Sequence, residues 1–118
     1  METDMRYIEV AIALPVFQTF TYSVPGSFAD FMATGKRVLV PFGRRRETGY
    51  VFGQSQSPNI KEIKSILDIL DELPLFPSSM GPFFKWISDY YKYPIGQVVK
   101  NALPGGLNTR DNASVAIT

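Results

Sequence analysis

Alternation of side-chain character near the N-terminus constrains the fold of this chain more than any other feature. One face of residues 7–14 is formed by Ile8, Val10, Ile12 and Leu14. One face of residues 17–24 is formed by Phe20, Tyr22 and Val24. Successive side chains of a β-strand point to opposite faces, so a period of two residues predicts a half-buried strand in each stretch.

Residues 27–41 predict a short helical turn followed by a third strand. Apolar residues at Phe28, Phe31 and Met32 fit one turn of helix, which Gly35 ends. The strand is expected over residues 37–41. Proline has no N–H to donate, so Pro41 predicts either a sheet edge or the end of that strand.

A fourth strand is predicted over residues 48–55, with Tyr50 and Phe52 pointing the same way. Gly49 and Gly53 within it predict bulges or a close approach of another backbone. Residues 60–73 are ambiguous, because their apolar positions fit one face of a helix and one face of a strand equally well.

The last third of the chain predicts two helices. Ser79 is the expected N-cap of the first. Its apolar stripe consists of Met80, Phe83, Phe84, Ile87, Tyr90 and Tyr91. Trp86 lies beside this stripe and is expected to pack against the core. A shorter helix is striped by Ile95, Val98, Val99 and Ala102. It is expected to stop before Pro104.

The order of elements predicts an α+β fold: a small, curved, mainly antiparallel β-sheet or partial barrel followed by two C-terminal helices. We expect one domain over residues 5–104. Residues 105–118 are polar and aperiodic, which predicts a linker toward further domains.

Composition excludes several classes of function. The 118 residues include neither cysteine nor histidine, so thiolate zinc sites, disulfide frameworks and histidine bases are excluded. Twelve basic and 11 acidic residues nearly cancel, so any nucleic-acid contact must be local. Asp68, Asp71 and Glu72 are interpreted as a solvated turn and not as a catalytic pair. We expect a soluble, cytoplasmic, non-catalytic chain with no bound cofactor and no membrane partner.

The run from Phe42 through Gly43 to Arg44, Arg45 and Arg46 is the leading candidate for a binding site. A glycine turn offers bare backbone, and the guanidinium groups offer positive charge to phosphates. The alternative is a turn whose arginines only add solubility. Phe20 has two interpretations as well: an aromatic face for a base, or a core side chain.

Four motifs, in order, resemble the N-terminal domain of the PriA family, the bacterial primosomal replication-restart helicases also called primosomal protein N′. The motifs are Ala13-Leu14-Pro15-Val16, Thr19-Phe20-Thr21-Tyr22, the run from Gly35 to Gly43, and Tyr90-Tyr91-Lys92-Tyr93-Pro94-Ile95-Gly96 followed by Ala102-Leu103-Pro104. The resemblance extends from about residue 7 to residue 107.

The resemblance implies a module that binds the 3′ end of the nascent leading strand at stalled replication forks. In the family a small pocket holds the terminal nucleotide, and the matching positions are Phe20, Thr21, Gly43 and Lys64. Some members carry an aspartate where Thr21 stands. The implied parent is an ATP-dependent 3′-to-5′ DNA helicase whose ATP and zinc sites lie in other domains. Its implied partners are DNA with a free 3′ end, primosome proteins and single-strand binding protein.

Two other functions remain open at this point. The exposed face of the helix over residues 83–91 is able to dock a primosome protein or position a helicase core, with only incidental DNA contact. A sequence-tolerant RNA binder is less well supported, because the chain has no basic aromatic repeat.

Overall fold

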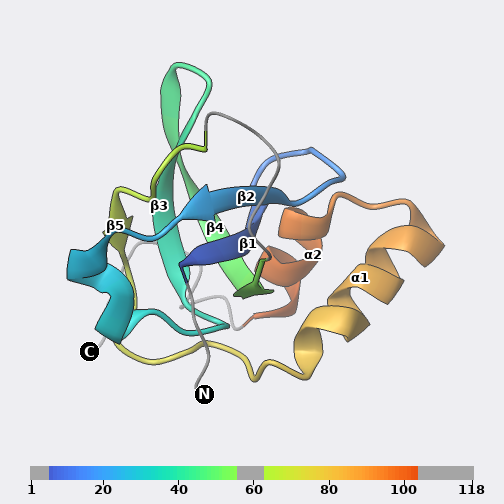
Figure 1. Cartoon of the computed structure of the whole chain (residues 1–118). Coiled ribbons are helices and arrows are strands. Elements are labelled where there is room, and N and C mark those ends of the chain that lie inside the picture. The colour runs from blue at the N-terminus through green and yellow to red at the C-terminus, as the bar shows by residue number, and fades with distance from the viewer. Residues whose placement is uncertain (1–5, 56–62, 104–118) are drawn as a thin grey trace.

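The computed structural model describes residues 6–55 and 63–103, and within them a five-stranded antiparallel sheet is followed by two helices (Figure 1). The strands are β1 (Tyr7–Ile12), β2 (Phe20–Ser23), β3 (Arg37–Phe42), β4 (Arg45–Gln54) and β5 (Asp68–Ile69). A 3₁₀ helix, η1 (Gly26–Phe31), connects β2 to β3, and the chain continues to α1 (Met80–Tyr91) and α2 (Ile95–Ala102). The predicted α+β class is confirmed.

The sheet curls because its two edges are joined by one crossing segment. The strand order is β2-β1-β4-β3-β5. Just before β5, the chain pairs with β2 at the opposite edge of the sheet. Ser23 of β2 donates its N–H to the Lys64 carbonyl at 2.9 Å, and its carbonyl accepts from the Ile66 N–H at 3.1 Å. Leu67 then donates to the Leu39 carbonyl of β3 at 2.7 Å. The segment therefore links β2 to β3 and closes a small barrel.

The interior of this barrel is apolar because the alternating strands turn the same face inward. Its buried residues are Ile8, Val10, Ile12, Tyr22, Val24, Met32, Val38, Val40, Val51 and Ile66. Tyr22 carries a hydroxyl into this core and donates it to the Pro41 carbonyl at 2.8 Å, so the group is satisfied. Burial also raises the pKa of the Tyr22 phenol.

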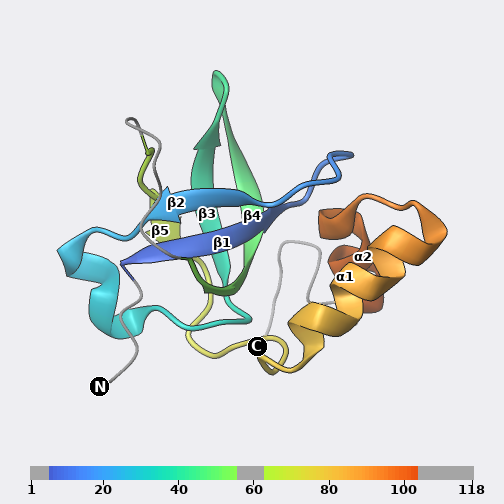
Figure 2. The same ribbon diagram turned by 45° about the vertical axis from the view of Figure 1, so that its right-hand side comes forward.

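A second core fills the space between the sheet and the helices. Its buried residues are Ala11, Tyr50, Phe52, Phe76, Phe84, Ile95, Val98 and Val99. In both views α2 lies between α1 and the strands β1 and β4 (Figure 2). The prediction that Tyr50 and Phe52 share a side is confirmed, since both face the helices.

The glycines of β4 behave as the sequence predicts. The register between β1 and β4 shifts between Glu9 and Val10, so Phe52 is the extra residue of a bulge next to Gly53. At Gly49 a Cβ would overlap the Val10 side chain, so this glycine permits close approach. On one side, Pro41 pairs with Arg46 of β4. On its other side no strand of the described residues reaches it, since β5 pairs with β3 at Val38 and Leu39. Pro41 thus lies at an open edge, as predicted.

The structure resolves one open alternative in the strands and corrects one predicted strand boundary. For residues 63–73, the part of the ambiguous segment that the structure describes, the chain is extended and includes β5, so the helical alternative fails there. The fourth strand begins at Arg45 and not near residue 48. Cross-strand pairing with the end of β3 extends β4 into the arginine run.

The predicted stripe of α1 is also only partly correct. The buried side of the helix is Gly81, Phe84 and Ser88, whereas Phe83, Trp86, Tyr90 and Tyr91 are exposed. The expectation that Trp86 packs into the core is wrong, because 54% of its surface remains exposed. Ser79 occupies the N-cap position but makes no side-chain capping bond. Because two of these three buried residues are small, α1 packs closely against the second core along a narrow face.

The predicted linker over residues 105–118 lies outside the described residues. Within the described ranges, no helix has the length and apolar character needed to span a membrane.

Gly96 gives a direct test of how closely α2 approaches the sheet. A Cβ at Gly96 would overlap the carbonyl group of Ile12, which is backbone of β1. Although alanine favours helix formation, we expect Gly96→Ala to lower the free energy of unfolding by about 1–3 kcal/mol through overpacking. Urea unfolding measures this change. Gly26→Ala is the control, because nothing lies within 4 Å of a Cβ there; equal effects of the two changes would contradict the packing described.

Candidate nucleic-acid interface

The barrel is closed incompletely, and this leaves an open seam between β2 and β3. Among residues 6–55 and 63–103, the crossing segment forms backbone hydrogen bonds with β2 only at Ser23. Nearer the other end of β2, side chains alone bridge the seam: the rings of Phe20 and Phe42 meet edge to face with centroids 5.2 Å apart. The Tyr22 hydroxyl bond to Pro41 lies between these two points. We use "open seam" for this border of Phe20, Thr21, Phe42 and Gly43.

Phe20 occupies the boundary between core and surface. It is cross-strand partner to Val10, so its ring is on the inner face of the sheet, where it packs against the barrel core. The ring is nevertheless half-buried and not fully enclosed. The two interpretations of Phe20 are therefore compatible, because the ring packs against the core and still leaves part of its surface exposed.

The Thr21 side chain points to the opposite face from Phe20. It is cross-strand partner to Glu9, and its Oγ1 lies 3.3 Å from the Oγ of Ser55. The Thr21 backbone is directed differently. In an antiparallel pair, alternate residues turn N–H and C=O to the same edge, and Ser23 turns both toward the crossing segment. The Thr21 N–H and C=O therefore face the seam, where they meet no hydrogen-bond partner among residues 6–55 and 63–103.

Gly43 forms one end of the open seam, and Lys64 lies beyond the other end, beside Ser23. Gly43 follows Phe42 in a turn with φ +63°, it is exposed, and a Cβ at this position would have nothing within 4 Å. Its backbone is therefore bare, as the sequence predicts. Lys64 accepts the Ser23 N–H through its carbonyl and has an exposed side chain. Of the two predicted pocket residues in β2, Phe20 turns its side chain to the inner face and Thr21 turns its side chain away.

The sequence suggested that the three arginines lie together on one turn, and the structure separates them. Only Arg44 lies in the turn; Arg45 and Arg46 begin β4. Cross-strand pairing puts Arg45 opposite Phe42, hence on the same face, and Arg46 opposite Pro41 on the other face. The Arg45 Nη2 also pairs with the Glu47 Oε2 at 3.0 Å. The hairpin carrying these residues projects beyond the barrel (Figures 1 and 2).

Phe42 begins the candidate run, but the sequence analysis assigned no role to its ring. Its ring contacts Phe20 and it directly precedes Gly43, so it joins these two candidates in space. The available signal was its position at the end of an apolar strand. Only the curling of the sheet, however, brings β2 and β3 together there.

The interpretation of Asp68, Asp71 and Glu72 as a solvated turn is wrong for Asp71, whose side chain is largely buried in an ion pair. Asp71 is held by Arg37: the Nη2 lies 2.8 Å from Oδ1, the Nε lies 3.0 Å from Oδ2, and the Arg37 backbone N–H donates to Oδ2 at 2.8 Å. These hydrogen bonds raise the pKa of the Arg37 guanidinium. In the part of the chain that the structure describes, no three acidic side chains cluster to hold a metal ion.

Comparison with known proteins identifies the family. The family model of the PriA 3'DNA-binding domain (3'BD) matches residues 9–104. A protein from Haemophilus influenzae named replication restart protein PriA is 33% identical over 111 residues, which cover 92% of this chain and 15% of that protein. One from Treponema pallidum with the same name is 27% identical over 116 residues, covering 93% of this chain and 18% of that protein. This chain, which spans less than a fifth of the length of these curated relatives, belongs to the PriA 3′ DNA-binding domain family.

Proposed function

We propose that this domain binds the free 3′ end of a DNA strand at the open seam, without reading its sequence. The observation that carries the proposal is the combination found there: a half-buried aromatic pair, bare glycine backbone, and Thr21 backbone groups that have no partner within the described part of the chain. The family described as a 3'DNA-binding domain supports the choice of ligand.

Each group at the seam has a role that its chemistry suits. The exposed part of the Phe20 ring stacks on the terminal base, which is possible for any base because every base has a π-face. The Thr21 backbone supplies one donor and one acceptor for the terminal sugar, and thus contributes without its side chain. The Gly43 backbone approaches the strand closely. Lys64 and Arg45 contact phosphates, because both have exposed cationic side chains on this border.

The wider function is proposed from the relatives. We take the domain to cover residues 5–104, with residues 105–118 linking it to the rest of a restart helicase. In that cytoplasmic parent, ATP and zinc belong to other domains, and this domain supplies no catalysis. It recognises the nascent leading-strand end at a stalled fork, while primosome proteins and single-strand binding protein act on the whole assembly.

A second candidate function is a protein-docking module, and one observation favours it. Trp86 and Tyr90 stack on the outer side of α1 with centroids 5.2 Å apart and planes inclined by 13°. Both rings are exposed, and aromatic residues are enriched in the centres of protein interfaces. Variants of this stack therefore serve as controls for DNA binding: Trp86→Ala with Tyr90→Ala leaves binding unchanged if the seam is the DNA site.

The end itself, and not strand length, is expected to set affinity. An oligonucleotide with an accessible 3′-hydroxyl end should bind more tightly than a matched one whose last nucleotide is buried in duplex. Fluorescence anisotropy with the 118-residue chain measures both affinities. Equal affinities, or a preference unchanged when the exposed end is the 5′ end, would refute the proposal.

Phe20→Ala is expected to weaken DNA binding by about 1–3 kcal/mol, because a stacked base loses its platform. The half-buried ring should also contribute to stability, by less than the roughly 3–5 kcal/mol lost when a fully buried phenylalanine is truncated. Phe28→Ala is the matched control, since Phe28 packs against the same core from η1. If Phe28→Ala weakens DNA binding as much as Phe20→Ala at temperatures where both are folded, Phe20 acts only through the fold.

Arg45 and Arg46 lie on opposite faces of the hairpin, so replacing each of them should affect DNA binding differently. Arg45→Gln should weaken binding of every sequence and reduce the slope of log affinity against log salt by roughly 0.7, the value for one phosphate contact on a single strand. Arg46→Gln removes the same charge from the opposite face and should leave that slope unchanged. Preference for a free 3′ end should persist in both variants. Equal slopes for the two variants would show that the hairpin acts only by general attraction.

A further inference from the structure

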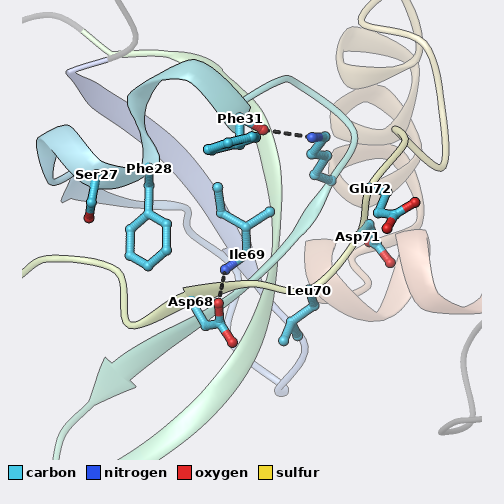
Figure 3. Close-up of a pocket in the computed structure, with 9 residues that line it drawn as sticks. Ser27, Phe28, Phe31, Asp68, Ile69, Leu70, Asp71 and Glu72 are labelled. Carbon is cyan, nitrogen blue, oxygen red and sulfur yellow. Dashed lines mark hydrogen bonds between the residues drawn. The ribbon is translucent and has the colours of Figure 1, made fainter.

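A pocket separate from the open seam lies between η1 and β5 (Figure 3). Its volume is about 530 Å³. The residues that line it are Ser27, Phe28, Phe31, Lys36, Asp68, Ile69, Leu70, Asp71 and Glu72. In both overall views the arginine hairpin points away from η1 (Figures 1 and 2). The pocket thus lies on a different part of the molecule from the proposed DNA site.

The walls of this pocket are apolar and partly open. Phe28 and Ile69 are half-buried and pack against the barrel core. Phe31 is 63% exposed and Leu70 is 41% exposed, so both offer apolar surface to a partner. A volume of this size lies within the range of about 300–1,000 Å³ typical of binding pockets, and accommodates a large side chain together with its flanking backbone.

The rim of the pocket carries negative charge that the described residues do not fully neutralise. Asp68 accepts the backbone N–H of Ile69 at 2.8 Å but forms no ion pair with a described residue. Glu72 is exposed and likewise has no ion-pair partner within residues 6–55 and 63–103. The third carboxylate, Asp71, is already held by Arg37. The two free carboxylates are therefore available to cations of a partner.

Lys36 adds hydrogen-bond donors inside the pocket. Its side chain is nearly enclosed, with 7% of the residue exposed, and its Nζ donates to the Phe31 carbonyl at 2.6 Å. An ammonium group has three N–H donors, and no other acceptor for this one is found among the described residues. The remaining donors suit a carbonyl oxygen, the acceptor that every peptide unit supplies.

We infer that this pocket docks a protein segment in which a large apolar side chain is flanked by lysine or arginine. The apolar side chain fills the space between Phe28, Phe31 and Ile69, and a backbone carbonyl of the segment accepts from Lys36. The flanking cations pair with Asp68 and Glu72. Nucleic acid is a poor occupant, because its phosphates would face these carboxylates. The inference does not depend on how the seam binds DNA.

The test is selection of a random 12-residue peptide library, displayed on phage, against the folded 118-residue chain. We expect the enriched peptides to carry an apolar residue next to lysine or arginine. A synthetic copy of the most enriched peptide should shift the backbone amide signals of Phe31, Ile69 and Leu70 in two-dimensional NMR. Phe31→Ser should abolish these shifts, and because this side chain is largely exposed the variant is expected to remain folded.

Charge variants distinguish pairing of opposite charges from nonspecific binding of the peptide. Replacing Asp68 with Asn and Glu72 with Gln should weaken the peptide by roughly 3- to 10-fold, as expected for two exposed ion pairs. Asp89→Asn, which removes an exposed carboxylate from α1, should leave its affinity unchanged. The inference is overturned if enriched peptides lack cations, if their shifts map to the aromatic face of α1, or if nothing is enriched. It is equally overturned if single-stranded DNA shifts the same amides.

Discussion

The structure depends on one strand, β4, serving two cores at once. Val51 faces the barrel interior, while Tyr50 and Phe52 on either side of it face the helices. A regular strand alternates in this way, but β4 must also follow the curl of the sheet. The bulge at Phe52 supplies the bend, and Gly49 lets β4 lie close to β1. With the helices fixed on one side of β4, the curl closes the other side into a barrel.

The incomplete closure of that barrel creates the candidate site. A fully paired barrel has no free strand edges and no unpaired backbone groups to offer. Here the described part of the crossing segment, from residue 63 on, pairs with β2 at Ser23 only, so the Thr21 backbone is left facing the seam. The aromatic contact between Phe20 and Phe42 covers the core at this point without burying the rings completely. The same two side chains therefore pack against each other and border the candidate site.

The near-neutral net charge conceals a separation of charge across the domain. Arginines are concentrated on the hairpin, whereas carboxylates without described ion-pair partners border the pocket between η1 and β5. Strands of DNA are attracted to the first region and repelled from the second. A cationic protein segment experiences the opposite preference. The two proposals therefore assign partners of opposite charge to separate surfaces.

The sequence by itself determined the element types outside residues 60–73, the inward face of the first strands and the glycines of β4, because these follow from side-chain period and local backbone freedom. Its family motifs also identified residues around the seam. The tertiary structure alone decided which side of α1 is buried, which arginine shares a face with Phe42, and that Thr21 reaches the seam only through its backbone. The physical reason is that these properties depend on register and strand order: pairing across the sheet, and not propensity along the chain, sets which groups meet.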